Sequence, residues 1–198
     1  GRVIARPFKG VYPFDRITEK RKDFSAIPPE NNLNEILQKN DVNTYSIGKI
    51  VDLFAGNGFD EYHKTENNAE GIKELLKAMD SVKDTFVFVN LIDTDQLYGH
   101  RLDPEGYAKS LEEFDTVLPD ILAKMDATDL LIITGDHGND PCSNSTDHSR
   151  EFVPLLVYPA TKLEQIDLGT RETFSDIAKS IAHFYNVEND FPGISFLP

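Results

Sequence analysis

The segment Thr85-Phe-Val-Phe-Val-Asn-Leu-Ile92 decides the fold that the sequence predicts. It is dense in β-branched and aromatic residues and apolar on both faces, as expected of a strand buried inside a two-sided sheet. A helix is predicted before it, where apolar residues from Ile72 to Met79 keep a spacing of three to four. A second helix is predicted after it, beginning at Asp103-Pro104-Glu105 with proline in the first helical position. Pro119 is expected to kink or split this second helix.

Strand and helix patterns alternate along the rest of the chain. Residues 42–47, 130–134 and 153–158 have the apolar, β-rich composition of strands, and the last two are expected to be buried. A short helix is predicted from Leu33 and a final one over residues 174–184. This alternation predicts an α/β fold with a mainly parallel sheet and helices on both faces.

The charge of the chain is strongly acidic overall and unevenly distributed. A net charge of −14 argues against nucleic acid or an anionic membrane as a partner. Residues 1–24 nevertheless carry seven basic and three acidic side chains, which makes this stretch basic. It is either a solvated basic tail or a phosphate-binding surface that faces an acidic body.

Further sequence features indicate a cytoplasmic protein. The longest apolar runs are too short to span a bilayer, and no signal peptide is visible. The single cysteine, Cys142, excludes an internal disulfide and suits a reducing cytosol. The chain begins at Gly1 with strand-like residues and without methionine, so we expect it to be part of a longer protein.

Candidate metal ligands follow two of the predicted strands. Asp95 and His100 come after the first of them, Asp136 and His137 come after the second, and His148 lies eleven residues beyond His137. Sites in open α/β sheets form at the carboxyl ends of strands, so these side chains are expected to converge. Carboxylates and imidazoles together suit Mn²⁺, Zn²⁺ or Fe²⁺, and five ligands favour two ions over one. The alternative is that they are ordinary turn-capping and polar loop residues.

Three motifs carry a resemblance to a known family. They are Asn90-Leu-Ile-Asp-Thr-Asp-Gln-Leu-Tyr-Gly-His-Arg-Leu-Asp103, Thr134-Gly-Asp-His-Gly-Asn-Asp-Pro141 and Thr146-Asp-His-Ser-Arg-Glu151. They resemble the metal-binding signatures of phosphopentomutases, which belong to the alkaline phosphatase superfamily. Gly1-Arg-Val-Ile-Ala-Arg-Pro-Phe8 and Ile47-Gly-Lys-Ile50 also resemble motifs of that family.

The resemblance implies two divalent metal ions, expected to be Mn²⁺. Asp95, His100 and His148 correspond to the protein ligands of one ion, and Asp136 and His137 to two ligands of the other. In the family the second ion also takes an aspartate from near the N-terminus and a threonine that carries the phosphoryl group. No motif in the 198 residues matches either one. The nucleophilic threonine is therefore expected upstream of this chain.

The resemblance also implies substrate contacts and a domain division. Arg2 and Lys49 match positions that contact the sugar phosphate, with Ile4 nearby, although Lys49 alone could be an ordinary surface lysine. Residues 1–26 would be the C-terminal remnant of an inserted cap domain. Residues 27–198 would be the C-terminal part of the metal-binding α/β core.

The implied reaction interconverts ribose or deoxyribose 1-phosphate and 5-phosphate through a phosphoenzyme and a bisphosphate intermediate. The expected partners are a small sugar phosphate and the missing N-terminal half of the same enzyme, with no nucleic acid and no membrane. Two other interpretations stay open. One is another member of the superfamily, such as a cofactor-independent phosphoglycerate mutase or a phosphatase. The other is a metal-binding fragment that is inactive without its other half.

Overall fold

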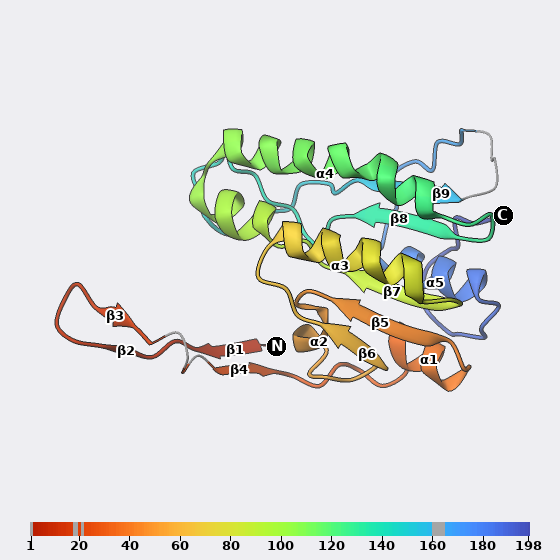
Figure 1. Ribbon diagram of the computed structural model, residues 1–198, viewed down its shortest axis with the longest axis horizontal. Helices are drawn as coiled ribbons and strands as arrows, with labels where there is room; N and C mark the ends of the chain where they lie inside the picture. Colours follow the sequence, from red (N-terminus) through yellow and green to blue (C-terminus); the bar gives the residue numbers. More distant parts are fainter. Residues whose placement is uncertain (1, 18–19, 21, 160–164) are drawn as a thin grey trace. The chain divides into compact units, whose positions relative to one another are not determined.

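The computed structural model describes residues 2–17, 20, 22–159 and 165–198 (Figure 1). The chain folds as two compact units. Unit 1 comprises residues 1–64, 84–88 and 172–198, and unit 2 comprises residues 65–83 and 89–171.

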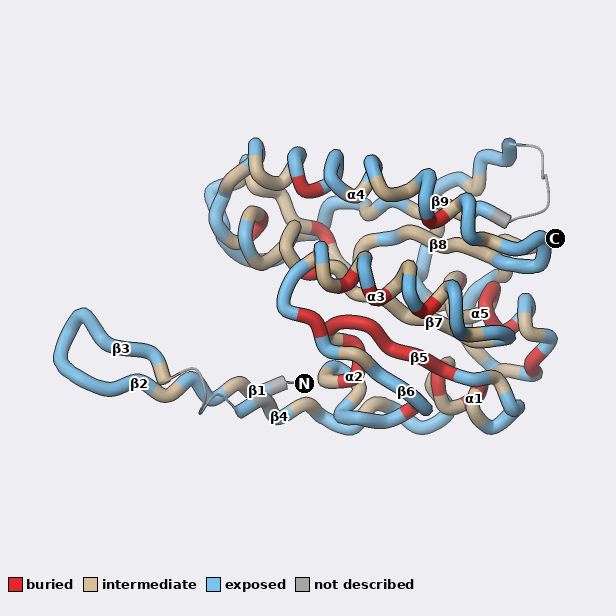
Figure 2. Tube along the Cα trace, in the orientation of Figure 1, coloured by how far each residue is buried: buried red, intermediate tan, exposed pale blue. Residues whose placement is uncertain are grey.

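A three-stranded sheet with a buried central strand organises unit 1. Its order is β6 (Glu61–His63), β5 (Asn43–Ile47) and β7 (Thr85–Val89). Strands β5 and β6 run parallel, with Tyr45 opposite Glu61. Four of the five residues of β5 are buried, whereas β7 at the sheet edge is half-buried throughout (Figure 2).

Short helices cover this sheet and complete the core of unit 1. They are α1 (Leu33–Lys39), α2 (Ile50–Leu53) and α5 (Ser175–Phe184). Helix α1 begins at Asn32, whose side chain accepts a hydrogen bond from the Glu35 backbone N–H at 3.3 Å, a typical N-cap. Leu37, Ile47 and Ala182 are completely buried, so α1, β5 and α5 share one apolar core.

The described part of residues 2–25 forms a long hairpin in unit 1. Strand β1 (Arg2–Ala5) pairs antiparallel with β4 (Lys22–Ser25), and β2 (Phe8–Lys9) pairs antiparallel with β3 (Asp15–Arg16). The rings of Phe8 and Phe14 lie 4.6 Å apart at its tip. The predicted boundary at residue 26 between a cap remnant and the core stays a prediction.

Two helices and an antiparallel strand pair build unit 2. They are α3 (Asn68–Ser81), α4 (Pro104–Lys124), β8 (Leu130–Thr134) and β9 (Leu155–Pro159). Helices α3 and α4 pack side by side (Figure 1) and bury Ala78 and Ile121, each 1% exposed.

Helix α4 starts where the sequence predicted. Asp103 caps it by accepting the Gly106 N–H at 2.9 Å, and Pro104 takes the first helical position. The helix runs through Pro119 without a break, so the expected split is wrong, while the alternative of a kink stays a prediction. Pro119 lies on the exposed side, where water can satisfy the carbonyl that loses its partner. No helix in the described ranges is both long and apolar enough to cross a membrane.

The α/β class predicted from the sequence is confirmed, with a parallel sheet in unit 1. Two details differ from the expectation. Strands β8 and β9 are antiparallel, and the strands expected to be buried are not: β7 is half-buried, β8 is half-buried up to the exposed Thr134, and Leu156 and Tyr158 of β9 are 59% and 50% exposed. Among the described residues, β7 and β8 each have one hydrogen-bonded neighbour strand.

Candidate metal centre

The candidate site lies in unit 2, on the turns after β7 and on the loop after β8, and a backbone bridge within that loop brings its two ends together. After β7 the chain enters a π-helical turn (η2, Thr94–Tyr98) and a 3₁₀ turn (η3, Gly99–Arg101). Such π-turns are rare and occur often at functional sites. After β8, Gly138 pairs with Ser149, whose N–H donates to the Gly138 carbonyl at 2.9 Å. This bridge brings His137 and His148 to the same place.

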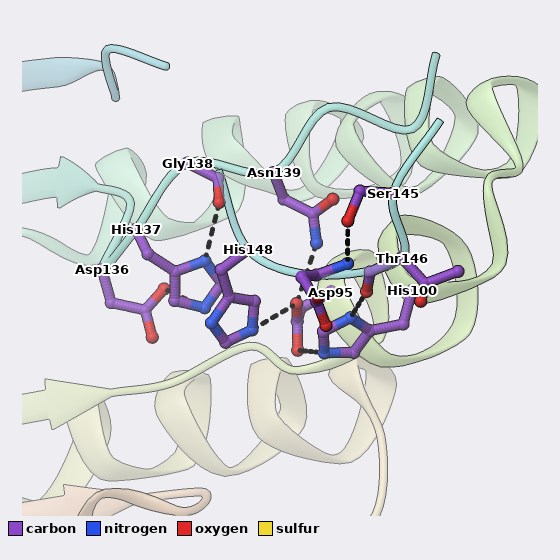
Figure 3. Close-up of polar contacts among 10 residues, drawn as sticks. Asp95, His100, Asp136, His137, Gly138, Asn139, Ser145, Thr146 and His148 are labelled. Atoms are coloured by element: carbon purple, nitrogen blue, oxygen red, sulfur yellow. Dashed lines mark hydrogen bonds and ion pairs between the residues drawn. The ribbon is translucent and has the colours of Figure 1, made fainter. Parts of the chain in front are cut away.

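Three of the five predicted ligands form the centre of the cluster. One ligand atom each of Asp95, His137 and His148 lies within 4.8 Å of the other two (Figure 3). His148 Nε2 lies 3.4 Å from Asp95 Oδ1, and the rings of His137 and His148 stack with centroids 3.6 Å apart.

The other two predicted ligands flank this centre. His100 Nε2 lies 3.4 Å from Asp95 Oδ2, so Asp95 faces one imidazole with each oxygen. Asp136 Oδ1 lies 3.5 Å from His137 Nε2. All five side chains therefore lie together in the structure (Figure 3), while their role as metal ligands stays a prediction.

Backbone carbonyls fix the orientation of two imidazoles. His137 Nδ1 lies 3.1 Å from the Gly138 carbonyl oxygen, and His100 Nδ1 lies 2.5 Å from that of Thr146. Because a carbonyl can only accept, each hydrogen bond has Nδ1 as its donor, and Nε2 is the nitrogen of each ring that faces the cluster. Histidines that bind metals are held in this way by a second partner.

The donor set fits a divalent metal ion. Two atoms bound to one ion at about 2.1 Å in tetrahedral directions lie about 3.4 Å apart, close to the separations seen here. The side chains are also accessible, since their exposed fractions run from 27% for His137 to 66% for Asp136. Carboxylate and imidazole together suit Mn²⁺, Zn²⁺ and Fe²⁺.

Two neighbouring residues were not predicted from the sequence. Asn139 Nδ2 donates to Asp95 Oδ1 at 3.0 Å. The second is Tyr107. Burial is the main cause that raises the pKa of its phenol above the ordinary 10.0, and the negative charge of Asp95 raises it further. Asn139 stands within the quoted Thr134–Pro141 motif, but nothing in the sequence distinguishes it from its polar neighbours.

The three predicted substrate residues belong to unit 1, apart from the cluster in sequence and in folding unit. Arg2 begins β1, and its side chain lies outside the described part of the structure. Ile4 is half-buried in the same strand, and Lys49 is a half-buried residue at the N-cap of α2. Their contact with a sugar phosphate stays a prediction.

Comparison with known proteins identifies the family of this chain. A profile of the Metalloenzyme superfamily matches residues 18–189, which contain all five candidate ligands. This chain belongs to the Metalloenzyme superfamily. Membership and the donor set together support binding of a divalent metal ion in the region of Asp95, His137 and His148.

Curated relatives confirm the resemblance to phosphopentomutases. The chain is 50% identical over 196 residues to the phosphopentomutase of Dictyoglomus turgidum, covering 99% of this chain and 50% of the relative. It is 49% identical over 197 residues to the phosphopentomutase of Lachnoclostridium phytofermentans, covering 100% of this chain and 50% of the relative. It is 47% identical over 195 residues to the phosphopentomutase of Deinococcus radiodurans, covering 98% of this chain and 50% of the relative. The chain thus spans about half the length of the curated relatives it matches.

A solved structure supports the fold of this superfamily member. The structure of the PH0037 protein from Pyrococcus horikoshii matches with a TM-score of 0.60 at 18% identity, covering 88% of this chain and 58% of that one. At this identity the likeness concerns the fold alone.

Proposed function

We propose that this chain is the metal-binding part of a phosphopentomutase that interconverts ribose or deoxyribose 1-phosphate and 5-phosphate. The observation that carries the proposal is the convergence of Asp95, His137 and His148 within 4.8 Å, with His100 and Asp136 beside them. The identities of 47–50% to curated phosphopentomutases support the same reaction.

The five ligands are proposed to hold two divalent ions, with Mn²⁺ as the expected metal. Asp95, His100 and His148 would hold one ion, because Asp95 faces both imidazoles at 3.4 Å. Asp136 and His137 would contribute to the other. When bound, such a pair of ions stabilises the charge on the oxygens of a phosphoryl group in transfer.

The residues of this chain would prepare the site in two ways. The imidazoles of His100 and His137 keep their proton on Nδ1 by donating to backbone carbonyls, which leaves Nε2 available. Arg2 and Lys49, with Ile4 nearby, would bind and orient the sugar phosphate. Basic groups for this task are needed because the chain as a whole carries a charge of −14, which repels a phosphate.

The nucleophile is proposed to lie in the part of the relatives that this chain does not span. No motif of the chain matches the threonine that carries the phosphoryl group in the family. The chain alone would therefore bind metal without turnover, and its partner would be the remaining half of the enzyme.

Exposed apolar side chains in the first 27 residues suggest that another part of the enzyme covers this segment. Val11 and Tyr12 are 88% and 84% exposed, and Val3, Phe24 and Ile27 are also mostly exposed. Apolar patches of this kind mark interaction sites. We propose that the rest of a cap domain covers them, and that the enzyme works in the cytoplasm, where the exposed Cys142 stays reduced.

The experiment compares two forms of the protein with Mn²⁺ present. The 198-residue chain is assayed alone and joined to the remaining half, with ribose 1-phosphate as substrate and ribose 5-phosphate as product. We expect turnover in the joined form only, and loss of at least about 100-fold on His148→Ala. His183→Ala is the matched control, because His183 lies on α5 in unit 1 and contacts Ser195. A joined protein that is inactive on pentose phosphates, or one indifferent to His148→Ala, would contradict the proposal.

A further inference from the structure

Asn139 contacts the most central carboxylate of the cluster. Its Nδ2 donates to Asp95 Oδ1 at 3.0 Å (Figure 3), and the same oxygen faces His148 Nε2 at 3.4 Å. Asp95 lies in the turn after β7, and Asn139 lies in the loop after β8. The hydrogen bond therefore joins the two segments that supply the candidate ligands.

Gly99 makes room for this contact. A Cβ placed on Gly99 would lie 2.2 Å from Nδ2, 2.7 Å from Cγ and 2.9 Å from Oδ1 of Asn139. Real Cβ atoms do not approach other heavy atoms so closely, so any side chain at position 99 must displace the carboxamide.

The backbone of Gly99 gives no other reason for glycine. Its φ and ψ are both −59°, in the right-handed helical region that every L-residue adopts. Glycine at this position is thus explained by the neighbouring carboxamide and not by backbone strain.

We propose that Asn139 is a positioning residue that holds Asp95 in the orientation needed for metal binding. Asp95 must present one oxygen to His148 and the other to His100, and this fixes the rotation of its carboxylate. A hydrogen bond to Oδ1 from a side chain that is itself held over Gly99 restricts that rotation. The inference rests on the proposed role of Asp95 as a metal ligand.

A double-mutant cycle tests the proposal, with the variants Asn139→Ala, Gly99→Ala and the two combined. The measurements are Mn²⁺ affinity by titration calorimetry and the melting temperature without metal. Each single variant should lower Mn²⁺ affinity by about 10- to 100-fold, the usual effect of losing a partner of a metal ligand. The double variant should bind no more weakly than Asn139→Ala, because removal of the carboxamide leaves space for the new Cβ. Asn144→Ala, on an exposed part of the same loop, should bind as the unaltered protein does.

The outcomes separate this inference from the proposed function. If Asn139→Ala binds Mn²⁺ as tightly as the unaltered protein, or if the two effects multiply in the double variant, the positioning role is wrong. If Gly99→Ala fails to fold, the double variant should fold again, and its failure to do so would equally overturn the proposal. If the unaltered protein binds no Mn²⁺, the proposed metal site fails, and non-additive melting temperatures would still test the contact between Asn139 and Gly99.

Discussion

The imidazole rings of His137 and His148 stack with centroids 3.6 Å and planes 19° apart. The two histidines are separated by ten residues in sequence, and the bridge between Gly138 and Ser149 holds them together. A short backbone contact therefore determines whether the candidate ligands meet.

Gly138→Ala should break this contact and abolish metal binding by the cluster. A Cβ on Gly138 would lie 2.7 Å from the Glu151 nitrogen and 2.8 Å from the Ser149 oxygen, which are backbone atoms that cannot rotate away. Titration calorimetry with Mn²⁺ measures the effect. Gly135→Ala is the matched control, since its Cβ would meet the Val153 side chain at 3.1 Å, and it should keep most of the affinity. Equal Mn²⁺ affinities for the two variants would show that the bridge does not hold the site.

Lys49→Ala and Arg2→Ala should weaken sugar-phosphate binding without changing metal affinity. Loss of one hydrogen bond between charged groups should raise the KM for ribose 1-phosphate by about 10- to 100-fold. The assay uses the chain joined to the remaining half of the enzyme. Lys109→Ala is the control, because Lys109 lies on α4 and its Nζ is 3.8 Å from Glu113 Oε1. An unchanged KM in both variants would remove these residues from the substrate site.

Asp60 should stabilise unit 1 through its hydrogen bonds with Thr44. Its Oδ2 accepts from the Thr44 N–H at 2.8 Å and hydroxyl at 2.9 Å, and Thr44 is 1% exposed. Asp60→Ala should lower the free energy of unfolding by about 1–3 kcal/mol, because buried donors lose their acceptor. Asp52→Ala, which removes an exposed ion pair with Lys64, should lower the free energy of unfolding by less than about 1 kcal/mol. Urea unfolding at pH 7 measures both, and equal losses would contradict the role of Asp60.

The same carboxylate should add a pH dependence to stability. Burial raises the pKa of Asp60, but hydrogen bonds from Thr44, from Gln38 and from its own backbone outweigh this and bring the pKa below the ordinary 3.8. A carboxyl with a lowered folded-state pKa stabilises the fold above the unfolded value and loses this contribution as the pH falls through the folded value. The stability difference between the unaltered protein and Asp60→Asn should therefore be largest above pH 3.8 and shrink below it. If this stability difference instead grew as the pH fell, the folded-state pKa of Asp60 would be raised rather than lowered, and the prediction would be wrong.

The elements with strong local signals could be predicted from the sequence. Strand β8 has the predicted bounds because Leu-Leu-Ile-Ile-Thr is apolar throughout, and α4 begins at Pro104 because Asp103 and the proline specify a helix start. Strand β6 was missed, since Glu61-Tyr62-His63 is polar and becomes a strand only by pairing with β5. Its stability comes from a tertiary contact that no local pattern shows.

The relative direction of β8 and β9 depends on the segment that connects them and not on the sequences of the two strands. A parallel pair needs a crossover, usually a helix, whereas residues 135–154 between β8 and β9 contain no described helix. The antiparallel pairing of β8 and β9 was therefore predictable from that stretch, but the apolar patterns alone suggested parallel strands. In the site, the five candidate ligands could be found because carboxylates and histidines cluster after strands. Asn139 could not, because its role depends on the empty space at Gly99.

Titration of the 198-residue chain with Mn²⁺, compared with its Asp95→Ala variant, tests the metal centre most directly. In the proposed assignment Asp95, which faces both His100 and His148, completes a set of three ligands for one ion, whereas Asp136 and His137 would supply two ligands to the other. We predict one tighter and one much weaker site in the unaltered chain, and loss of the tighter site in Asp95→Ala. Absence of Mn²⁺ binding by a folded chain, or an Asp95→Ala variant that keeps the tighter site, would contradict the metal centre proposed for this chain.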